Sequence, residues 1–596
     1  MNSLKFSIFQ NQYVEIKNTI DNKKIDNFFE NKFYLTFNRE KTYIGLSDFF
    51  KKKDAVMNFL IIENINYELT DEFISTMKSS MSYRSAIDKE LIPKDLIEKR
   101  LREAEFVRVP NINQIKNLQK LCSLQAGASF SVPGAGKTTE ALSFYAYHRK
   151  NFNSKLLVFS PINAFISWKD EIHSCFGKDY KIERLRGSPY QINEIIKSDP
   201  QFSIINYEAM RSEEKLEIIR NFIINHKNDL TVILDESHKI KGENISEIIA
   251  DLAPFIDYKL ILTGTPMPQA PTDLVSQFKF LYPSDQIGSS LDLVDLFEPI
   301  YVRTTKKDLG LYKVDRKLVY VEPYPAFKLF YDEYIKKSLS DGMQLEDILI
   351  SNSLKKAVLK LLKFFSNPYS CIEDVQRLDP GLAIRLEEEG DGAKIDALIE
   401  RAKHLTEIEN EKVIIWSYFR KHVELIAEKF GNKAEYIHGG VKIQKNEEDE
   451  FEDLESREYK IDRFKNDPQC MILVANPAAA AESISLHEHC NYALYLDRTF
   501  NAGQFLQSQD RIHRYIEKIK EKKKTIEIFM LNMPGSIEEN VHNALNRKID
   551  NMSSFLNDPS LQSLVGFNQP DILLSSDINV EDVDLQVNDE DLLDLN

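Results

Sequence analysis

The residues best suited to chemistry form a glycine-rich run that ends in a lysine and two threonines, SVPGAGKTT at 131–139. Its glycines allow backbone N–H groups to close around phosphate, Lys137 places a cation on the outer phosphates, and Thr138 offers a hydroxyl to Mg²⁺. A helix expected over 139–149 would direct its positive end at the same anion. Ser131 stands where the pattern G-x-x-x-x-G-K-[ST] has its first glycine. We predict a nucleotide-phosphate site made by Pro133, Gly134, Ala135, Gly136, Lys137, Thr138 and Thr139.

Two adjacent carboxylates end the hydrophobic run TVILDE at 231–236. If this run is a strand of a parallel sheet, Asp235 and Glu236 lie at the carboxyl edge, where such sheets bind ligands. Asp235 would hold the Mg²⁺ shell, and Glu236 would orient and deprotonate an attacking water. The alternative is a surface acidic pair that ends a strand. It fits poorly, because the pair follows the phosphate-binding run by about one hundred residues.

Two arginines lie in QSQDRIHR, residues 507–514. Arg511 and Arg514 are three residues apart, so on a helix they would project from one face. A guanidinium fork suits the charge that develops on a transferred phosphoryl group. A solvated basic helix face is the alternative. The catalytic interpretation gains support because the pair follows a second set of strands, as in an ATPase whose nucleotide lies between two lobes.

Two sets of short hydrophobic runs are expected to position these residues. Each run is β-branched or leucine-rich and ends in a turn or polar cluster, which is typical of a parallel sheet covered on both faces. The first set is KLLVFS, FSIINY, TVILDE and KLILTG, and the second is KVIIWS, AEYIHG, CMILVA, YALYLD and TIEIFML. We predict an α/β chain with two parallel-sheet lobes and helical protrusions between them, plus a small N-terminal α+β accessory domain and an acidic tail.

The expected domains are an accessory domain over 1–105, a first, ATP-binding lobe over 106–305, a helical region over 306–400, a second lobe over 401–550 and a tail over 551–596. In the accessory domain, alternating runs at Lys32–Phe37, Thr42–Leu46 and Asn58–Glu63 predict strands. Stretches near Asp71–Ser85 and from Pro93 toward Phe106 predict helices.

A net charge of −16 is unusual for a protein that binds nucleic-acid phosphates, because such binding needs Lys and Arg. Most of the negative charge lies at one end of the chain, where residues 549–596 hold eleven acidic residues and no basic one. Residues 446–458 form an acidic insertion, and we expect the tail to be disordered. The five cysteines form no CxxC pair and no run could span a bilayer, so we expect a cytoplasmic protein without a signal peptide, a zinc site or a membrane segment.

The order of the motifs resembles that of the superfamily 2 helicases, and within them the Swi/Snf-type double-stranded DNA translocases, from about 111 to 548. LLVFSPINAFISWKDEI is similar to the second block of that family, and SIINYEAM to its "TYE" element. DESHKIKG resembles "DEAHRIKN", LTGTPMPQAPTDLVSQFKFLYP resembles "LTGTP…L…FL.P", and VRTTKKDL resembles "LRRTKKDV". Later in the chain, KVIIWSYF, YIHGG and QSQDRIHR resemble "KVLIFSQF", "R.DGS" and "QAxDRxHR".

The resemblance implies two RecA-like lobes and a motor that uses ATP and Mg²⁺ to track duplex DNA. It implies that Gln114 reads adenine, since the competing Gln119 is too close to Lys137 in the sequence. Coupling of hydrolysis to lobe movement would fall to His238, Thr263, Gly264, Thr265 and Gln507. DNA contacts would involve Ser160, Lys306, Lys307 and Asn476.

The chain departs from the family in its second half. ANPAAAAESISL at 475–486 replaces "STRAGGLGINL"; it keeps small residues but loses the glycines and the arginine, which leaves the individual DNA contacts open. RTFNAG replaces "WNP" and retains only Asn501. The loop after Arg514 carries five lysines within 518–524, which either touch DNA or form a solvated face.

Other features have ordinary structural explanations. Trp168 and Trp416 are expected in the core rather than as base-stacking platforms, and His487, His489 and Cys490 are expected to be structural. The tail either restrains the ATPase as a charge mimic of DNA or serves as a solubilising or partner-docking segment.

Two other functions remain open. The first is a strand-separating helicase on single-stranded DNA or RNA, which would use the same ATPase residues. The second is a nucleotide-gated scaffold that recruits a protein partner, such as a nuclease, through the accessory domain or the tail.

Overall fold

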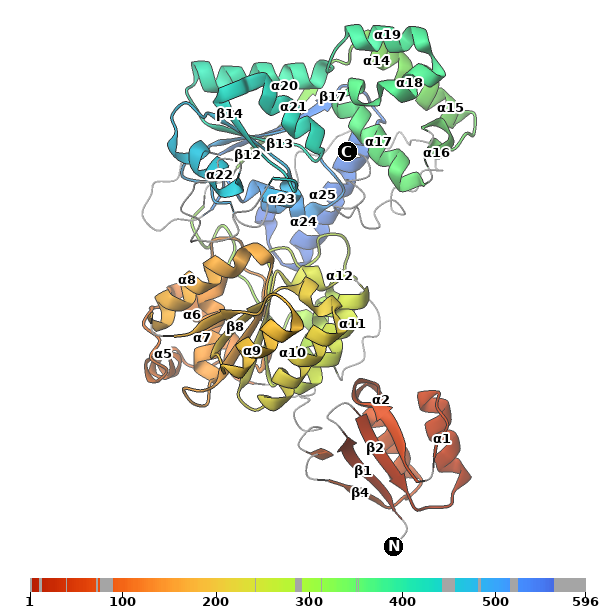
Figure 1. Cartoon of the computed structure of the whole chain (residues 1–596), viewed down its shortest axis with the longest axis vertical. Helices are drawn as coiled ribbons and strands as arrows, with labels where there is room; N and C mark the ends of the chain where they lie inside the picture. The colour runs from red at the N-terminus through yellow and green to blue at the C-terminus, as the bar shows by residue number, and fades with distance from the viewer. Residues whose placement is uncertain are drawn as a thin grey trace. The chain divides into compact units, whose positions relative to one another are not determined.

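The computed structural model describes residues 3–561 except 10–12, 39, 71–72, 75–88, 179, 242, 284–291, 312–313, 350, 352, 442–455, 481–483 and 515–523. The chain divides into two compact units, Met1–Asp308 and Leu309–Asn596, whose elements are labelled in Figure 1. The acidic insertion up to residue 455, the lysines at 518–523 and the tail beyond 561 lie outside the described residues.

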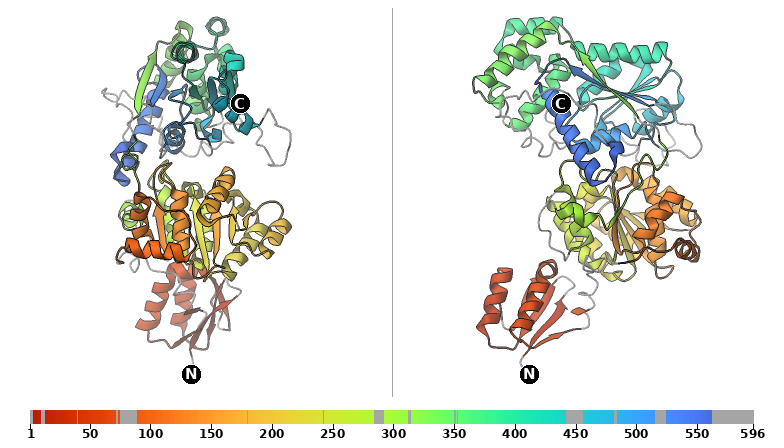
Figure 2. Two further views of the ribbon diagram at one scale, coloured as in Figure 1. Left: turned by 90° about the vertical axis from the view of Figure 1, so that its left-hand side faces the viewer. Right: turned by 180° about the vertical axis from the view of Figure 1, so that it is seen from behind.

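The chain begins with a four-stranded sheet of order β3-β2-β1-β4. Its elements are β1 (Leu4–Phe9), β2 (Tyr13–Asn18), α1 (Lys23–Phe33), β3 (Thr42–Gly45), α2 (Leu46–Ile62) and β4 (Tyr67–Leu69). Strand β1 runs antiparallel to β2 and parallel to β4. Both helices lie at one face of the sheet, as Figure 2 shows, and the ring of Phe6 packs there at 5.8 Å from that of Phe49.

The strand predictions for this domain are partly wrong. The run at 42–46 is confirmed as β3, whereas 58–62 belongs to α2 and residues 32–33 end α1. The apolar residues there pack helix against helix, with Phe28 stacked on Phe59 at a ring separation of 3.9 Å. The helix expected after Pro93 is confirmed as α5 (Lys94–Glu103), and the helix near 71–85 lies mostly outside the described residues.

A seven-stranded parallel sheet of order β11-β5-β10-β9-β6-β8-β7 follows, with helices on both faces (Figure 2). Its elements are α6 (Ile112–Leu121), β5 (Ala126–Ser129), α7 (Lys137–His148), β6 (Lys155–Phe159), α8 (Phe165–Phe176), β7 (Ile182–Arg184), α9 (Pro189–Lys197), β8 (Phe202–Ile205), α10 (Glu213–Asn225), β9 (Leu230–Asp235), α11 (Glu243–Leu252), β10 (Tyr258–Leu262), α12 (Asp273–Leu281), α13 (Asp292–Phe297) and β11 (Tyr301–Val302). Helix α5 joins this core through Ile97 and Leu101. The four predicted strands are confirmed.

Strand β5 was not predicted, because its sequence AGAS lacks the bulky apolar residues of a buried strand. Close packing explains this composition. A Cβ at Gly127 would lie 3.0 Å from the side chain of Leu121 and 3.3 Å from the carbonyl oxygen of Ile300. Small residues therefore let α6 and the chain before β11 approach the strand that leads into the phosphate-binding run.

The second unit contains a six-stranded parallel sheet of order β12-β17-β16-β13-β15-β14. Its elements are β12 (Asp315–Val321), α14 (Pro325–Phe330), α15 (Lys337–Ser340), α16 (Leu345–Ile348), α17 (Leu354–Ser366), α18 (Ile372–Leu378), α19 (Pro380–Glu388), α20 (Ala393–Lys403), β13 (Val413–Trp416), α21 (Arg420–Phe430), β14 (Ala434–Ile437), α22 (Arg457–Asn466), β15 (Ile472–Ala475), α23 (Pro477–Ala480), β16 (Tyr492–Tyr495), α24 (Ala502–Gln509), β17 (Thr525–Leu531) and α25 (Ile537–Phe555). All five predicted strands are confirmed. The region expected to be mostly helical nevertheless begins with β12, which pairs along its whole length with β17.

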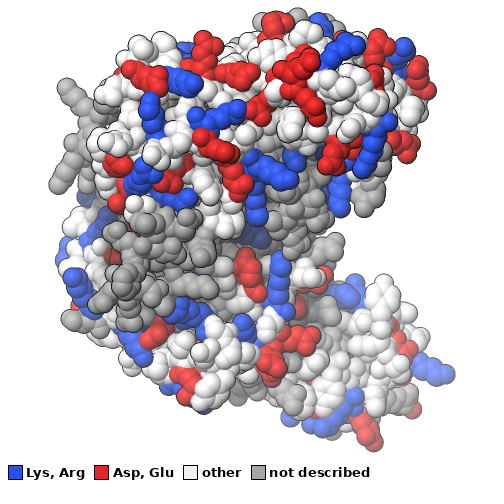
Figure 3. Space-filling model, turned by 45° about the horizontal axis from the view of Figure 1, so that its top comes forward, with Lys and Arg blue, Asp and Glu red and all other residues white. Residues whose placement is uncertain are grey.

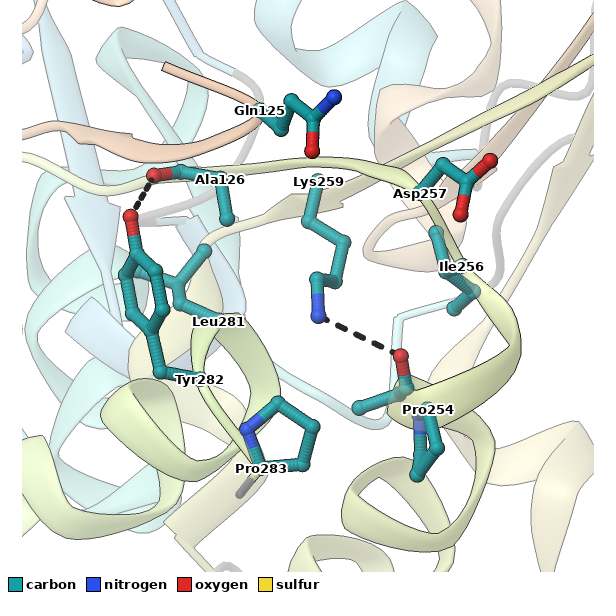
Figure 4. A pocket seen from close by; sticks show the side chains of 10 residues that line it. Gln125, Ala126, Pro254, Ile256, Asp257, Lys259, Leu281, Tyr282 and Pro283 are labelled. Atoms are coloured by element: carbon teal, nitrogen blue, oxygen red, sulfur yellow. Dashed lines mark hydrogen bonds between the residues drawn. The ribbon is translucent and has the colours of Figure 1, made fainter. Parts of the chain in front are cut away.

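A small pocket lies at the amino-terminal edge of the first sheet, next to the starts of β5 and β10 (Figure 4). Lys259 donates to the carbonyl oxygen of Ala253 at 3.3 Å, and the hydroxyl of Tyr282 donates to that of Ala126 at 2.7 Å. Because the strands are parallel, the residues that follow them lie at the opposite edge. The pocket is therefore separate from the phosphate-binding run. Within the described part of the chain, no helix is long and apolar enough to cross a membrane.

Candidate nucleotide site and the arginines of the second sheet

Three neighbouring strands bring the predicted motifs of the first unit to one edge of its sheet. Strands β5, β10 and β9 are adjacent in that order, and Leu262 is in register with both Ser129 and Asp235. The phosphate-binding run follows β5, the LTGTP motif spans the end of β10, and the carboxylate pair ends β9. The sheet thus places all three motifs side by side at its carboxyl edge, where parallel sheets bind ligands.

The phosphate-binding run has the geometry that its glycines predict. Gly134 and Gly136 have φ values of 86° and 78°, in the left-handed region. Helix α7 begins at Lys137, two residues before the predicted start, so its first turn includes the lysine and both threonines. The ammonium of Lys137 donates to the carbonyl oxygen of Ser131 at 2.8 Å, across the loop that would hold phosphate.

Gln114 contacts this loop. Its backbone and side chain form a capping box with Asn111 at the start of α6. Its side-chain amide then donates to the carbonyl oxygen of Gly136 at 3.1 Å. A Cβ at Gly136 would lie 2.4 Å from that amide nitrogen, so the glycine is required for this contact as well as for its φ. The structure therefore brings the residue proposed to read adenine beside the phosphate-binding run.

Asp235 is held from two sides. The indole N–H of Trp168 donates to its carboxylate at 2.8 Å, and the hydroxyl of Tyr207 donates to its backbone carbonyl at 2.6 Å. Burial, and next the neighbouring Glu236, raise the pKa of the Asp235 carboxyl, while the Trp168 N–H and Lys137 lower it. A cation at this edge would restore the charged form.

Glu236 adopts a left-handed conformation with φ of 48°, which a side chain other than glycine rarely takes. One of its carboxylate oxygens is buried and accepts no hydrogen bond from the described residues. The Nδ1 atom of His238 lies 3.5 Å from that oxygen. A carboxylate that is short of hydrogen-bond donors is suited to accept a proton from water.

Within the first unit, residues predicted to couple hydrolysis to movement contact one another. Nδ1 of His238 and the hydroxyl of Thr263 are 2.8 Å apart, and the backbone N–H of Thr265 donates to the same hydroxyl at 3.1 Å. A Cβ at Gly264 would lie 3.1 Å from the ring of Pro133. The LTGTP motif therefore touches the carboxylate motif on one side and the phosphate-binding run on the other.

Helix α8 supplies two contacts that the sequence did not reveal. Trp168 is buried in the core, as predicted, but its N–H also reaches Asp235. Glu171, three residues later, accepts from the hydroxyl of Thr139 and pairs with Arg108 at 2.7 Å. Trp168 and Glu171 are three residues apart and so lie on one face of the helix, which was the only feature of the sequence that pointed to these contacts. Trp416, the other tryptophan, is fully buried, as expected.

In the second unit, the prediction that Arg511 and Arg514 share one helical face is wrong, because α24 ends at Gln509. Arg511 is buried and donates to the carbonyl oxygens of Gln507 at 3.1 Å and Ile484 at 3.2 Å. Arg514 donates to the carbonyl oxygen of Asp510 at 3.2 Å. Backbone carbonyls, rather than helix periodicity, hold this pair.

The predicted DNA contacts are placed differently from one another. The hydroxyl of Ser160 is buried and faces the carbonyl oxygen of Pro161, and the buried side chain of Asn476 bonds to backbone atoms of Tyr418 and Ala478. Lys307 is exposed. Figure 3 shows basic and acidic side chains interleaved over the described residues of its visible face. All four contacts remain predictions.

No group of three or more histidine, cysteine, aspartate or glutamate side chains arranged for a metal ion occurs among the described residues. Cys490 is a buried free thiol, and the ring of His487 bonds to the hydroxyl of Ser485. Burial raises the pKa of the Cys490 thiol to about 11, which keeps it protonated and unsuited to bind a metal.

Comparison with known proteins identifies two conserved domains in the chain. An SNF2-related domain matches residues 126–289, and a helicase conserved C-terminal domain matches residues 393–516. The chain therefore carries both conserved domains of a Swi/Snf-type superfamily 2 helicase. Helicases of this kind are ATP-hydrolysing enzymes, so the resemblance of the motifs is confirmed.

The relatives of this SNF2-type ATPase are distant. An "Uncharacterized ATP-dependent helicase" of Mycoplasma pneumoniae is 26% identical, over 68% of this chain and 38% of the relative. The "ISWI chromatin-remodeling complex ATPase ISW1" of Saccharomyces cerevisiae is 24% identical, over 73% of this chain and 39% of the relative. This chain thus spans about two fifths of the length of these curated relatives. The solved "SWI2/SNF2 ATPase core in complex with dsDNA" of Sulfolobus solfataricus is 17% identical, with a TM-score of 0.31, over 78% of this chain and 98% of that one.

Proposed function

We propose that the chain is an ATP-dependent DNA translocase, which couples hydrolysis of Mg–ATP to movement along duplex DNA. The supporting observation is the contact of three motifs at one sheet edge, above all the hydrogen bond between His238 and Thr263. This bond connects the motif of Asp235 and Glu236, which would activate water, to the end of β10, which would move when the nucleotide changes. In an SNF2-type ATPase, such a link turns a change at the nucleotide into a change of conformation.

ATP would bind with its phosphates over the start of α7. Lys137 would exchange its bond to the carbonyl oxygen of Ser131 for charge-assisted bonds to phosphate oxygens, which are stronger. The adenine would meet the side chain of Gln114, which already lies against Gly136. Binding would therefore exchange existing contacts within the loop rather than create a new loop.

Thr138 and Asp235 fit a hydrated Mg²⁺. Each carboxylate oxygen of Asp235 accepts one hydrogen bond, from Trp168 or from the backbone of Glu236, and so retains acceptor capacity. Mg²⁺ keeps several waters and usually needs only one or two protein oxygens besides the phosphates. When bound, the ion would neutralise phosphate charge. Trp168 would hold the Asp235 carboxylate in place for it.

Glu236 would act as the general base. Its carboxylate would accept a proton from the attacking water and become neutral, and His238, which lies between Glu236 and Thr263, would link this change to Thr263. Arg511 and Arg514 would stabilise charge on the transferred phosphoryl group. Their carbonyl acceptors are neutral, so a phosphate oxygen would be a stronger partner for either guanidinium.

The DNA-contacting roles of Ser160, Lys306, Lys307 and Asn476, the coupling role of Gln507 and the domain boundaries given above belong to this proposal. So does a cytoplasmic location, since all five cysteines are free thiols, as in a reducing compartment.

Displacement of a labelled third strand from a DNA triplex tests the proposal. With ATP, the full chain should release the third strand and leave a fluorescent duplex intact, and Glu236→Gln should release no third strand. Unwinding of the duplex would favour the strand-separating helicase. ATP turnover with no strand release, together with tight binding of a protein partner, would favour the scaffold.

A further inference from the structure

The base of the phosphate-binding run rests on a buried polar cluster to which the ATPase chemistry assigns no role. It consists of Asn117 on α6, Ser131 at the start of the run, Glu140 on α7 and Thr304 after β11. Their exposed fractions are 5%, 1%, 2% and 3%. Polar side chains without access to solvent need partners, because an unpaired buried polar group is costly, and one carboxylate oxygen of Glu140 has no hydrogen-bond partner among the described residues.

Asn117 is the centre of this cluster. Its side-chain amide donates to the carboxylate of Glu140 at 2.7 Å and to the hydroxyl of Thr304 at 3.0 Å, and lies 3.4 Å from the hydroxyl of Ser131. An amide nitrogen carries two hydrogens, so the two shorter contacts are its main bonds. One side chain thereby joins the helix that carries Gln114, the helix that begins with Lys137 and the segment that follows β11.

Thr304 holds the start of the run at two points. Its backbone N–H donates to the hydroxyl of Ser131 at 3.0 Å, and its carbonyl oxygen accepts from the N–H of Val132 at 3.0 Å. The carbonyl of Ser131 is the acceptor of Lys137, so the ammonium and the cluster share one residue. The segment of Thr304 reaches the end of the first unit at Asp308.

Two members of the cluster depart from the family patterns. Ser131 replaces the first glycine of the phosphate-binding pattern, and Thr304 stands where "LRRTKKDV" has its second arginine. These two residues hydrogen-bond to each other. A glycine at 131 would have no hydroxyl for the N–H of Thr304. The hydroxyl of Ser131 and the hydroxyl of Thr304, which accepts from Asn117, therefore both contribute to the cluster.

We propose that Asn117, Ser131, Glu140 and Thr304 are positioning residues, which set the shape of the phosphate-binding run and join it to the segment leading into the second unit. The carboxylate of Glu140 supports this role. It accepts from the side-chain amide of Asn117 at 2.7 Å, and it lies on α7 three residues after the lysine that would bind phosphate.

The inference rests on the proposed nucleotide site but not on DNA movement. KM for ATP and kcat of the full chain without nucleic acid therefore test it. A purely structural role would reduce the amount of active enzyme and hence the apparent kcat, whereas a positioning role raises KM. For Ser131→Ala we expect KM to rise about tenfold and kcat to change by less than about threefold. Ser143→Ala is the matched control, because this buried serine of α7 bonds to the carbonyl oxygen of Thr139 in its own helix.

Ser131→Gly is the sharper variant, because it restores the first glycine of the general pattern G-x-x-x-x-G-K-[ST]. The proposal predicts that it raises KM as Ser131→Ala does. An unchanged or lower KM in both variants would overturn the proposal.

Thr304→Val removes one hydroxyl and keeps the shape of the side chain. Combined with Ser131→Ala it should raise KM by less than the product of the two single effects, as expected for residues that share a partner. Independent, multiplicative effects on KM would contradict the proposal that these residues act as one cluster.

Glu140→Gln keeps an oxygen that can accept from Asn117, so it should raise KM less than Glu140→Met, and equal effects on KM would count against the proposal. If the wild type shows no response to DNA, the translocase proposal fails while this comparison of KM values still stands.

Discussion

In the first parallel sheet His238 and Trp168 bond to side chains of other motifs, whereas Arg511 and Arg514 of the second unit donate to backbone carbonyl oxygens. His238 bonds to Thr263, Trp168 to Asp235 and Gln114 to Gly136, and each bond joins two separate motifs or blocks. Arg511 and Arg514 instead donate to carbonyl oxygens of nearby segments. We infer that the proposed nucleotide site is assembled within the first unit, whereas the two arginines proposed to act on phosphoryl transfer are bonded to backbone carbonyls of the second.

This difference separates binding from turnover. Changes in the first sheet should affect nucleotide affinity, proton transfer or both, because its contacts exist before the nucleotide arrives. Changes to the arginines should affect mainly turnover, because the backbone carbonyls to which they donate belong to the second unit. The following mutations test whether nucleotide affinity and turnover depend on different units.

Arg511→Ala should have the largest effect. We expect kcat to fall by about a thousandfold, as for loss of an arginine finger, with affinity for ATP little changed. Steady-state turnover and titration with a fluorescent ATP analogue measure the two quantities. Arg511→Lys keeps the charge but loses the planar fork and should recover only part of kcat. A large loss of affinity in Arg511→Ala would break the division between the units.

Glu236→Gln should lower kcat by about a hundredfold to a thousandfold, because the amide cannot accept the proton of the attacking water. ATP binding should persist, so single-turnover experiments should show bound, unhydrolysed ATP. Normal turnover by this variant would show that Glu236 is not the base.

Lys137→Ala should weaken ATP binding by about a hundredfold, because it removes a charge-assisted bond to phosphate worth about 3 kcal/mol. Equilibrium titration measures this loss directly. Lys155→Ala is a suitable control. That lysine pairs with Asp199 at the start of β6, which is the edge of the sheet away from the phosphate-binding run. Equal losses in the two variants would rule out the proposed phosphate site.

Trp168→Phe should have the smallest effect, about threefold to tenfold in kcat, because it removes one hydrogen bond to the Asp235 carboxylate and keeps an aromatic ring. The Trp168 N–H lowers the pKa of Asp235, so its loss should raise that pKa and move the acid limb of the pH–rate profile to higher pH. Trp416→Phe is the matched control. Its indole N–H is buried in the second sheet and has no hydrogen-bond partner among the described residues. Identical pH profiles for the two variants would remove Trp168 from the site.

The sequence predicted most of both sheets, because a buried parallel strand is a continuous apolar run. Strand β12 reads DRKLVYV, and its half-exposed edge position admits charged residues, which hid it. Strand β5 was hidden by small residues that close packing requires. In the accessory domain, runs such as NFLIIE fit a strand and a helix equally well over so few residues, and packing between phenylalanine rings decided for the helix.

The site could be predicted where its residues lie in short contiguous motifs. The phosphate-binding run, the carboxylate pair and LTGTP are contiguous motifs, and parallel strands bring them together. The contacts of Trp168, Tyr207 and Glu171 depend on how helices pack over the sheet, so spacing alone could not reveal them. The helical spacing of Arg511 and Arg514 was misleading, because α24 ends before either residue.

We propose that the nucleotide site forms without DNA and that rapid hydrolysis requires the arginines of the second unit. The most direct test is the ATPase rate of the full chain with no nucleic acid, single-stranded DNA, duplex DNA and RNA. We predict that duplex DNA raises kcat well above the other three conditions while KM for ATP stays nearly constant. Equal rates in all four conditions, or stimulation by RNA alone, would contradict the account.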